Sequence, residues 1–223
     1  MTGQPKFPKM NGLMFDLDGT LVDTLGDLAR AVNATRRAFG LPPLPEEQIT
    51  CHVGHGAENL VRKAIQVADN IPEADFPPIF KFYMAYYQEH LLDQTLPNPG
   101  VIETLDHYAD RTLACITNKP FVQTEAILKG LGMWDRFALV LGGDSLPEKK
   151  PSPVPFQTFM AKFGLDPQHT LMVGDGTADV GAARAAGVAI VAVTTGVTSR
   201  EELASLKPDL LLDRMDLMIP LVP

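Results

Sequence analysis

The sequence predicts an α/β fold in which a doubly wound, mostly parallel sheet carries an α-helical insertion near the N-terminus. Two observations support this prediction. From residue 101 to residue 196, strand-like apolar runs alternate with runs of helical spacing, whereas residues 23–94 show helical spacing and no convincing strand. Such alternation places parallel strands side by side with helices on both faces of the sheet. We therefore expect a core formed by residues 1–22 and 95–223 and a helical domain formed by residues 23–94.

The individual elements follow from their apolar patterns. Residues 13–15 form a short apolar run that is typical of a buried strand. In the insertion the helical runs cover residues 27–40, 56–69 and 76–94, and the stretch LPNPG at 96–100 is expected to link back to the core. After it we expect helices near 101–109 and at 122–132, 153–164 and 178–187, and strands at 112–117, 137–143, 170–175 and 189–196.

Composition and charge limit the possible partners. The chain has 223 residues, of which 45% are hydrophobic and 21% charged, which fits a globular protein with a sizeable core. Nineteen basic and 27 acidic residues give a net charge of -8, which argues against nucleic acid or an anionic membrane as the main partner. No apolar run approaches the ~20 residues of a transmembrane helix, the start MTGQPKFPKMNG lacks the apolar stretch of a signal peptide, and Cys51 and Cys115 suggest no disulfide framework. These features predict a cytoplasmic protein.

Two aspartates, Asp16 and Asp18, follow the first expected strand in the stretch FDLDGT. Because strand side chains alternate, both project to the same side. Like charges held close together are unfavourable unless a cation lies between them or one carboxylate is protonated. A hard divalent ion with oxygen ligands, such as Mg²⁺, would remove the conflict. For this stretch alone, a turn rich in Asp and Gly is the alternative.

Polar side chains also follow three other expected strands. They are Thr117, Asn118 and Lys119 after the first of these, Lys149 and Lys150 in the loop GGDSLPEKKP after the second, and Asp175 and Asp179 after the third. Each group alone could be a helix cap, a solvated lysine pair or a turn. Doubly wound sheets, however, bind ligands at the carboxyl ends of their strands. The four segments together therefore predict one site.

In this order FDLDGT, ITN, KKP and GDGTAD resemble the motif set of the haloacid dehalogenase-type phosphohydrolases. The resemblance implies a Rossmann-like catalytic core, and it implies that the helical insertion is the cap domain of one branch of that family. The stretches VGHGAENLV and GGDSLPEKKPSP are most similar to phosphoglycolate phosphatases, which hydrolyse 2-phosphoglycolate to glycolate and phosphate. We therefore expect a Mg²⁺-dependent phosphatase that acts on a small phosphorylated metabolite, as a monomer or homodimer.

The resemblance also implies roles for individual residues. Asp16 would be the nucleophile that forms an aspartyl-phosphate, and Asp18 the general acid and base. Three residues would contact the phosphoryl group: Thr117, Asn118 and Lys150. Lys150 would also add positive charge beside Asp16, and it is preferred to Lys149 because the family's lysine commonly precedes proline.

The metal, by the same resemblance, would be bound by Asp16, by Asp18 through its backbone carbonyl, and by Asp175. Asp179 would be a further ligand or an anchor that orients Asp175. One position departs from the common pattern, since close relatives often have Gly-Asp-Ser where this chain has Gly176 after Asp175. The change removes a hydroxyl near the metal but no ligand, so we expect activity to remain.

Several alternatives remain open at this stage. A sugar-phosphate or nucleotide phosphatase, or a phosphomutase, of the same fold would keep the same motifs. A phosphonate-cleaving relative would need a cap lysine as a Schiff base, for which Lys63 and Lys81 are candidates, although both also fit solvated helix positions. His52 and His55 could touch substrate but offer too few ligands for a metal site. A non-catalytic phosphate binder would not require a nucleophile such as Asp16.

Overall fold

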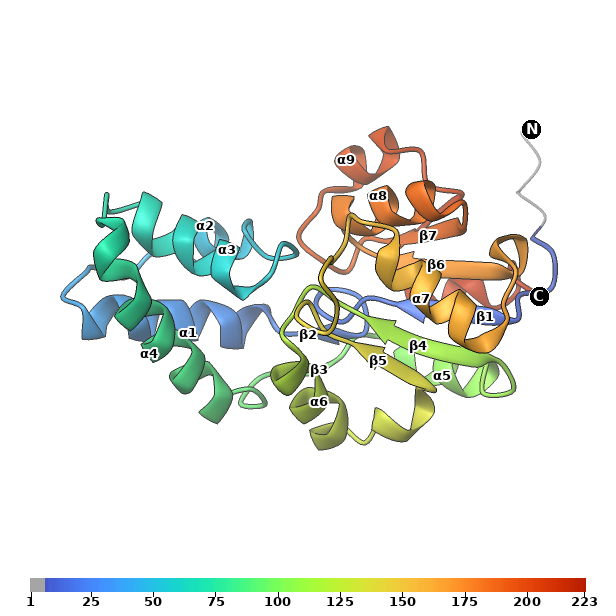
Figure 1. Ribbon diagram of the computed structural model, residues 1–223, viewed down its shortest axis with the longest axis horizontal. Helices are drawn as coiled ribbons and strands as arrows, with labels where there is room; N and C mark the ends of the chain where they lie inside the picture. The colour runs from blue at the N-terminus through green and yellow to red at the C-terminus, as the bar shows by residue number, and fades with distance from the viewer. Residues whose placement is uncertain (1–6) are drawn as a thin grey trace.

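The computed structural model describes residues 7–223 in two lobes (Figure 1). One lobe holds the sheet and both ends of the described chain, and the other consists of helices. The expectation that the chain has no signal peptide concerns its first residues, of which 1–6 lie outside the described part. Within residues 7–223, no helix has the length and apolar character needed to cross a membrane. The cytoplasmic location and the oligomeric state stay predictions.

Six parallel strands form the sheet, in the order β5-β4-β1-β6-β7-β8. Their bounds are β1 Gly12–Phe15, β4 Thr112–Ile116, β5 Leu139–Leu141, β6 Thr170–Gly174, β7 Ala189–Val193 and β8 Leu210–Leu212. Phe15 at the end of β1 is in register with Cys115 of β4 and Val173 of β6. The central strands therefore end at the same level, and the predicted doubly wound sheet is confirmed.

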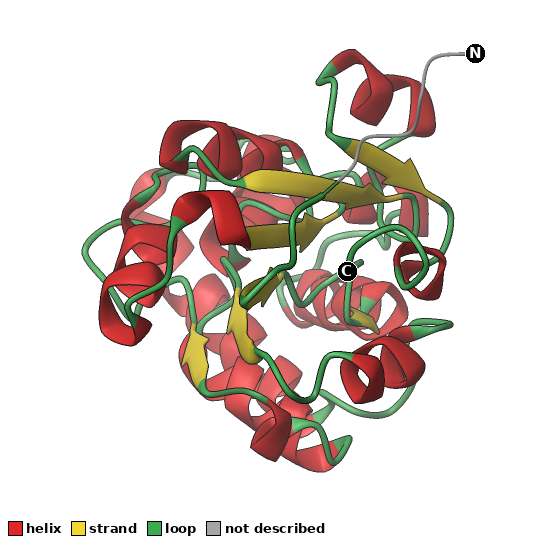
Figure 2. Cartoon of the chain, turned by 90° about the vertical axis from the view of Figure 1, so that its right-hand side faces the viewer, coloured by secondary structure: helices red, strands yellow, loops and turns green. Residues whose placement is uncertain are grey.

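Helices cover both faces of this sheet, as the turned view in Figure 2 also shows. Side chains alternate along β1, so that Leu13 and Phe15 pack into one apolar cluster and Met14 into another. The first cluster includes α5 (Val101–His107) and α6 (Phe121–Gly130), and the second includes α7 (Val154–Phe163) and α8 (Thr177–Ala186). Each fully buried large side chain stabilises such a core by roughly 1.5–3 kcal/mol. The layers thus hold the strand ends in fixed positions.

The second lobe, which we call the helical lobe, consists of residues 25–89. Its elements are α1 Leu25–Ala38, α2 Glu46–Thr50, α3 Ala57–Val61, a π-helical turn Arg62–Val67, a 3₁₀ turn Glu73–Asp75 and α4 Phe76–Glu89. Along α4, Ile79, Tyr83 and Tyr87 are spaced by four residues and are buried on one face, and Leu28 and Val32 of α1 belong to the same apolar cluster. The helical runs expected at 27–40 and 76–94 correspond to α1 and α4.

The chain leaves and re-enters the sheet lobe through a two-stranded antiparallel ladder. Its strands are β2 Val22–Asp23 and β3 Leu96–Pro97. The first two residues of the stretch 96–100, which was expected to be only a linker, therefore pair as a strand. Asn98 adds a side-chain bond from its Nδ2 to the Thr20 carbonyl (3.1 Å). The division into domains at residues 22 and 95 stays a prediction.

Some elements differ from the sequence expectations. The helical run expected at 56–69 is divided between α3 and the π-helical turn, and the strand expected at 137–143 is shorter, as β5. Two elements beyond residue 196 were not predicted, namely α9 Arg200–Ser205 and β8. Three 3₁₀ turns complete the described part: Trp134–Arg136, Pro167–His169 and Met215–Met218.

Candidate active site

The site begins where β1 ends at the carboxyl edge of the sheet. Asp16 directly follows β1, and its backbone N–H donates to the Val173 carbonyl of β6 (3.0 Å). The residue is buried, 7% exposed, and its side chain accepts a bond from the Leu17 N–H (2.7 Å). Because β1 lies between β4 and β6, Asp16 stands where the strand order reverses. That is the position at which doubly wound sheets bind ligands.

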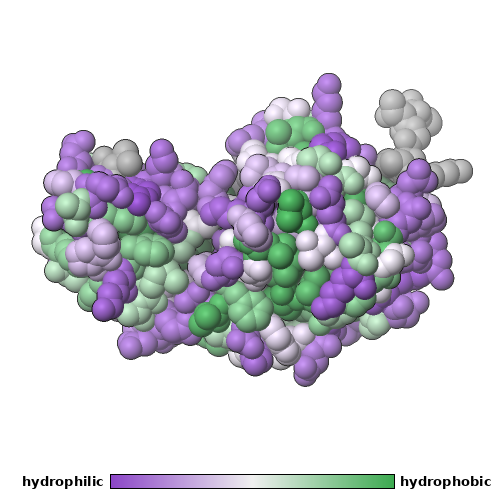
Figure 3. All heavy atoms as spheres, in the orientation of Figure 1, coloured by the Kyte–Doolittle hydropathy of each residue, from purple (hydrophilic) through white to green (hydrophobic). Residues whose placement is uncertain are grey.

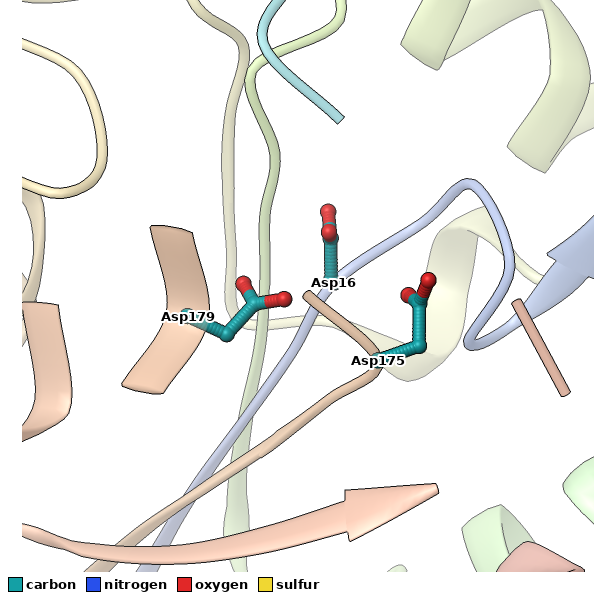
Figure 4. A group of neighbouring side chains, drawn as sticks. All are labelled: Asp16, Asp175 and Asp179. Atoms are coloured by element: carbon teal, nitrogen blue, oxygen red, sulfur yellow. The ribbon is translucent and has the colours of Figure 1, made fainter. Parts of the chain in front are cut away.

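Two further carboxylates lie on either side of Asp16, as Figure 4 shows. Asp175 follows β6, and Asp179 lies in the first turn of α8. All three are buried, and one oxygen of each lies within 4.8 Å of the others. Thr20 Oγ1 donates to Asp175 Oδ1 (2.7 Å), and the Gly176 N–H donates to Asp179 Oδ2 (3.0 Å). The loops after β1 and β6 thus hold the carboxylates in place.

Lys150 brings an ammonium group to these carboxylates. Its Nζ lies 2.9 Å from Asp16 Oδ1 and 2.7 Å from Asp179 Oδ1. Burial alone would lower the pKa of Lys150, but the charges of Asp16 and Asp179 outweigh it and raise the pKa. Lys149, the alternative lysine, is exposed, and its Nζ donates instead to the His55 carbonyl (3.0 Å).

The cluster carries more negative than positive charge. Burial, reinforced by Asp179, raises the pKa of Asp16 to about 7, although Lys150 opposes the shift. Burial and the charges of Asp16 and Asp179 raise the pKa of Asp175 well above its ordinary value. A divalent cation would relieve this accumulation of negative charge.

The free oxygens of the cluster fit a hard cation. Within residues 7–223, Asp16 Oδ2 and Asp175 Oδ2 accept no hydrogen bond, whereas Asp179 accepts bonds at both oxygens. Carboxylate oxygens are the ligands that Mg²⁺ prefers. Asp16 and Asp175 therefore fit as ligands, and Asp179 fits better as the anchor of Lys150 and of the turn at Gly176.

Asp18 lies outside this cluster. Its carboxylate accepts bonds from Lys119 Nζ at both oxygens (2.9 and 3.2 Å) and from Thr24 Oγ1 (2.7 Å). The sequence led us to expect a cation between the carboxylates of Asp16 and Asp18, whereas the structure gives Asp18 the ammonium of Lys119. The sequence interpretation included Lys119 in one of the four strand-end segments but gave it no individual role. The sequence feature that could have indicated its role is its position directly after ITN, at the end of a strand that pairs with β1.

Thr117 and Asn118 lie at the end of β4, beside β1. Thr117 Oγ1 accepts a bond from the Lys119 N–H (3.2 Å). Asn118 Nδ2 donates to the Lys150 carbonyl (2.9 Å) and to the Gly54 carbonyl of the helical lobe (3.0 Å). Asn118 therefore joins the loop of Lys150 to the lobe opposite.

A cavity of about 30 Å³ separates these strand ends from the helical lobe. On the core side it is bordered by Asp16, Asp18 and the segment 117–119, and on the lobe side mainly by apolar residues of α1, α3 and α4. A second cavity of about 30 Å³ reaches Asp175, and the loop 53–56 borders both. In Figure 3 the outline of the molecule narrows between the two lobes.

Glycine is required in the loop 53–56 at Gly56. Its φ is +95°, and a Cβ there would lie 2.9 Å from Lys149 Nζ and 3.1 Å from the Asn118 carbonyl. Gly56 of VGHGAENLV thus lets the lobe approach the core closely.

Among the other lobe residues singled out in the sequence, His55 borders the second cavity and His52 borders neither. His52 is partly buried, and burial together with Lys63 lowers its pKa. Among the described residues, neither His52 nor His55 belongs to the group that could hold a metal. Lys63 and Lys81 are exposed and border neither cavity.

Comparison with known proteins decides the family. The sequence profile of the haloacid dehalogenase-like hydrolases matches residues 13–193, a range that includes every motif described above. The chain belongs to the haloacid dehalogenase-like hydrolases. The resemblance inferred from the motifs is thereby confirmed.

Relatives of this hydrolase cover nearly its whole length. The phosphoglycolate phosphatase of Chromobacterium violaceum is 43% identical over 215 residues, which are 94% of this chain and 96% of the relative. That of Agrobacterium fabrum is 36% identical over 223 residues, 99% of this chain and 94% of the relative. The crystal structure of a predicted phosphoglycolate phosphatase from Haemophilus somnus superposes with a TM-score of 0.90 at 36% identity, covering 95% of this chain and 97% of that one.

Proposed function

We propose that this hydrolase is a Mg²⁺-dependent phosphatase that converts 2-phosphoglycolate to glycolate and phosphate. The observation that supports it most is the cluster of Asp16, Asp175 and Asp179 joined by Lys150 at the strand ends. Relatives named phosphoglycolate phosphatase that match over nearly the full length support the substrate.

In the first step, the Asp16 carboxylate would attack phosphorus. The bond between phosphorus and the ester oxygen breaks, an aspartyl-phosphate forms, and the leaving glycolate oxygen takes a proton from Asp18. Lys150 holds the Asp16 carboxylate in place at 2.9 Å. Thr117 would donate its hydroxyl hydrogen to a phosphoryl oxygen, and Asn118 its backbone N–H.

In the second step, Asp18 would take a proton from a water molecule whose oxygen attacks phosphorus. The bond from phosphorus to Asp16 breaks, so that phosphate leaves and both aspartates return to their starting states. Asp18 is held for this work by Thr24 and Lys119. One carboxylate thus serves as acid and then as base.

The residues that would hold Mg²⁺ are Asp16, Asp175 and the backbone carbonyl of Asp18, with Asp179 as a further ligand or as the anchor of Lys150. When bound, the ion would offset the negative charge shared by these carboxylates and the phosphoryl oxygens.

The helical lobe would act as a cap, with residues 23–94 as the cap domain and residues 1–22 and 95–223 as the catalytic core. The loop 53–56 borders both cavities and touches Asn118 and Lys149. A lobe in this position would have to move to admit substrate, and on return it would keep water from the aspartyl-phosphate until the leaving group departs.

The test is phosphate release from a panel of phosphorylated metabolites, with Mg²⁺ and with EDTA. We expect 2-phosphoglycolate to give the highest kcat/KM, EDTA to abolish turnover, and Asp16→Asn to be inactive but folded by circular dichroism. A tenfold preference for a hexose phosphate or a nucleotide would contradict the substrate. Conversion of a sugar phosphate to its isomer without phosphate release would indicate a phosphomutase, and a wild-type rate in Asp16→Asn would contradict the mechanism.

A further inference from the structure

A buried lysine, Lys119, faces the cavity between core and helical lobe. Its side chain is 3% exposed, its Nζ lies 2.9 Å from Asp18 Oδ1, and the same atom lies 4.7 Å from the centre of the Tyr87 ring. Among the described residues that border this cavity, Lys119 is the only one with a cationic side chain. Lys150 lies deeper, between Asp16 and Asp179. Any anionic group that enters this cavity would therefore meet Lys119.

Two tyrosine hydroxyls of α4 are buried beside the same cavity. Tyr83 and Tyr87 border it, their rings stack with centres 5.9 Å apart, and they are 0% and 2% exposed. Within residues 7–223, neither hydroxyl has a hydrogen-bond partner. A buried hydroxyl without a partner costs free energy, and native proteins rarely leave one unsatisfied. These two are thus available to a ligand.

Both hydroxyls can only act as neutral donors or acceptors. Burial raises the pKa of Tyr83 and of Tyr87 above the ordinary tyrosine value, so each keeps its proton at physiological pH. Lys119 Nζ lies over the ring of Tyr87, and the Tyr83 ring stacks on that of Tyr87. The core thus supplies a cation, and the helical lobe supplies two O–H donors, at one end of the cavity.

We propose that Lys119, Tyr83 and Tyr87 form a carboxylate subsite that selects phosphate esters carrying a carboxylate one carbon from the ester oxygen. The proposal rests on the proposed phosphatase function and deepens it. It assigns substrate specificity to a residue of the core acting together with two residues of the helical lobe.

The chemistry of such a substrate requires a second charged contact. A phosphorylated hydroxy acid has an anion at each end, and a buried carboxylate without a cationic partner is costly. An ammonium group has three donors, of which Asp18 uses at most two. Because Lys119 touches Asp18, the proposed acid, a carboxylate bound there lies next to the ester oxygen that Asp18 protonates. A substrate with a single carbon between its carboxylate and its ester oxygen fits this proximity.

The kinetic test compares 2-phosphoglycolate with 2-hydroxyethyl phosphate, which has a neutral CH₂OH in place of the carboxylate. Lys119→Met also removes a partner of Asp18, so rates on both esters are expected to fall. The diagnostic quantity is the kcat/KM for 2-phosphoglycolate divided by the kcat/KM for 2-hydroxyethyl phosphate. We expect this ratio to drop about 100-fold in Lys119→Met, as for loss of a charged hydrogen bond. Lys149→Met removes a nearby lysine that borders neither cavity and should leave the ratio unchanged. An unchanged ratio in Lys119→Met would overturn the proposal.

The tyrosines are tested by Tyr83→Phe and Tyr87→Phe. Each change removes a hydroxyl that has no partner within the described residues, so the melting temperature should stay the same or rise. The same kinetic ratio should fall about tenfold in at least one of the two variants. A lower melting temperature with an unchanged ratio in both variants would show a structural role instead.

A binding measurement separates this proposal from the proposed function. Calorimetry with Mg²⁺ would compare 3-phosphonopropionate, a non-hydrolysable analogue of 2-phosphoglycolate, with propylphosphonate, which lacks the carboxylate. We expect wild type to prefer the first and Lys119→Met to bind both alike. This readout holds even if no ester is turned over, a result that would contradict the phosphatase function alone. Equal affinities in wild type would refute the subsite.

Discussion

At the scale of single residues, two adjacent lysines have opposite surroundings. Lys150 is buried against Asp16 and Asp179, whereas Lys149 is exposed and its Nζ donates to the backbone carbonyl of His55. We expect Lys150→Met to lower kcat on 2-phosphoglycolate by about 10²–10³, the usual cost of removing one group that stabilises transition-state charge. Lys149→Met should change kcat less than about twofold, since a surface change of this kind has little effect. Initial rates at saturating substrate and Mg²⁺ compare the two, and equal losses would contradict the assignment.

Asp175 should destabilise the metal-free protein, because its carboxylate is buried near Asp16 and Asp179. We predict that Asp175→Asn raises the free energy of unfolding in EDTA at pH 8, because the amide replaces a carboxylate that is buried close to two others. Asparagine can still accept the bond from Thr20. Urea denaturation measures the difference.

The sign of the Asp175 effect follows from proton linkage. Its pKa is raised in the folded state, from an ordinary value of 3.8, so above pH 3.8 the folded protein holds more protons than the unfolded chain. The carboxylate's contribution to stability is therefore lost as pH rises through this window. The higher free energy of unfolding of Asp175→Asn should vanish near pH 4. In Mg²⁺ the variant should be less stable than wild type, because the amide lacks the negative charge that binds the ion. A variant that is less stable at every pH would refute this account.

The predicted site residues were found from strand ends, because the carboxyl ends of parallel strands must meet at one edge. That logic led to Asp16, Asp175 and Lys150, which the structure brings together. It could not indicate which acidic side chain pairs with which lysine. Asp18 is paired by Lys119, and this pairing depends on side-chain directions beyond β4 that no spacing in the sequence specifies.

At the scale of elements, the N-cap of helix α8 is Gly176, the position that departs from the Gly-Asp-Ser pattern. Its φ of -128° is accessible to any residue, and a Cβ there would lie 3.4 Å from Asp179 Oδ2, an ordinary contact. Serine is a better N-cap than glycine by a few tenths of a kcal/mol. We expect Gly176→Ser to raise the melting temperature slightly and to keep kcat within about twofold, because no ligand is removed. Differential scanning calorimetry and phosphate release test this, and a large loss of activity would show that the small residue is needed.

Long periodic elements were predictable, and short ones were not. The apolar spacing of α1 and α4 gave both helices, whereas the run at 56–69 looks helical throughout and yet contains a π-helical turn at Arg62–Val67. A π-turn shifts the hydrogen-bond register by one residue without changing composition. Strand β8 has only Leu210–Leu212, and it is a strand because β7 offers a parallel edge. Such pairing is decided by tertiary contacts rather than by local propensity.

At the scale of the whole molecule, the two lobes meet at a junction that depends on one buried carboxylate. Asp27 in the first turn of α1 is 1% exposed. Its Oδ2 accepts bonds from the backbone N–H groups of Gln94 and Thr95 and from the Thr95 hydroxyl, at 2.8–2.9 Å. The start of the helical lobe is thereby joined to the segment that returns to the sheet, and both connections between the lobes are fixed together.

Removing this carboxylate should therefore loosen the junction. We predict that Asp27→Ala lowers the free energy of unfolding by about 2–4 kcal/mol, because donors of the return segment lose their acceptor in a buried position. Asp93→Ala is the matched control, since Asp93 pairs with the same Arg30 as Asp27 but is exposed. The loss of unfolding free energy in Asp93→Ala should be clearly smaller, because at this exposed position water replaces the carboxylate as the partner of Arg30. Urea denaturation compares the variants, and hydrogen exchange at residues 94–98 should increase only in Asp27→Ala. Equal losses in both variants would mean that the pairing of Arg30, and not the acceptor at the junction, holds the two lobes together.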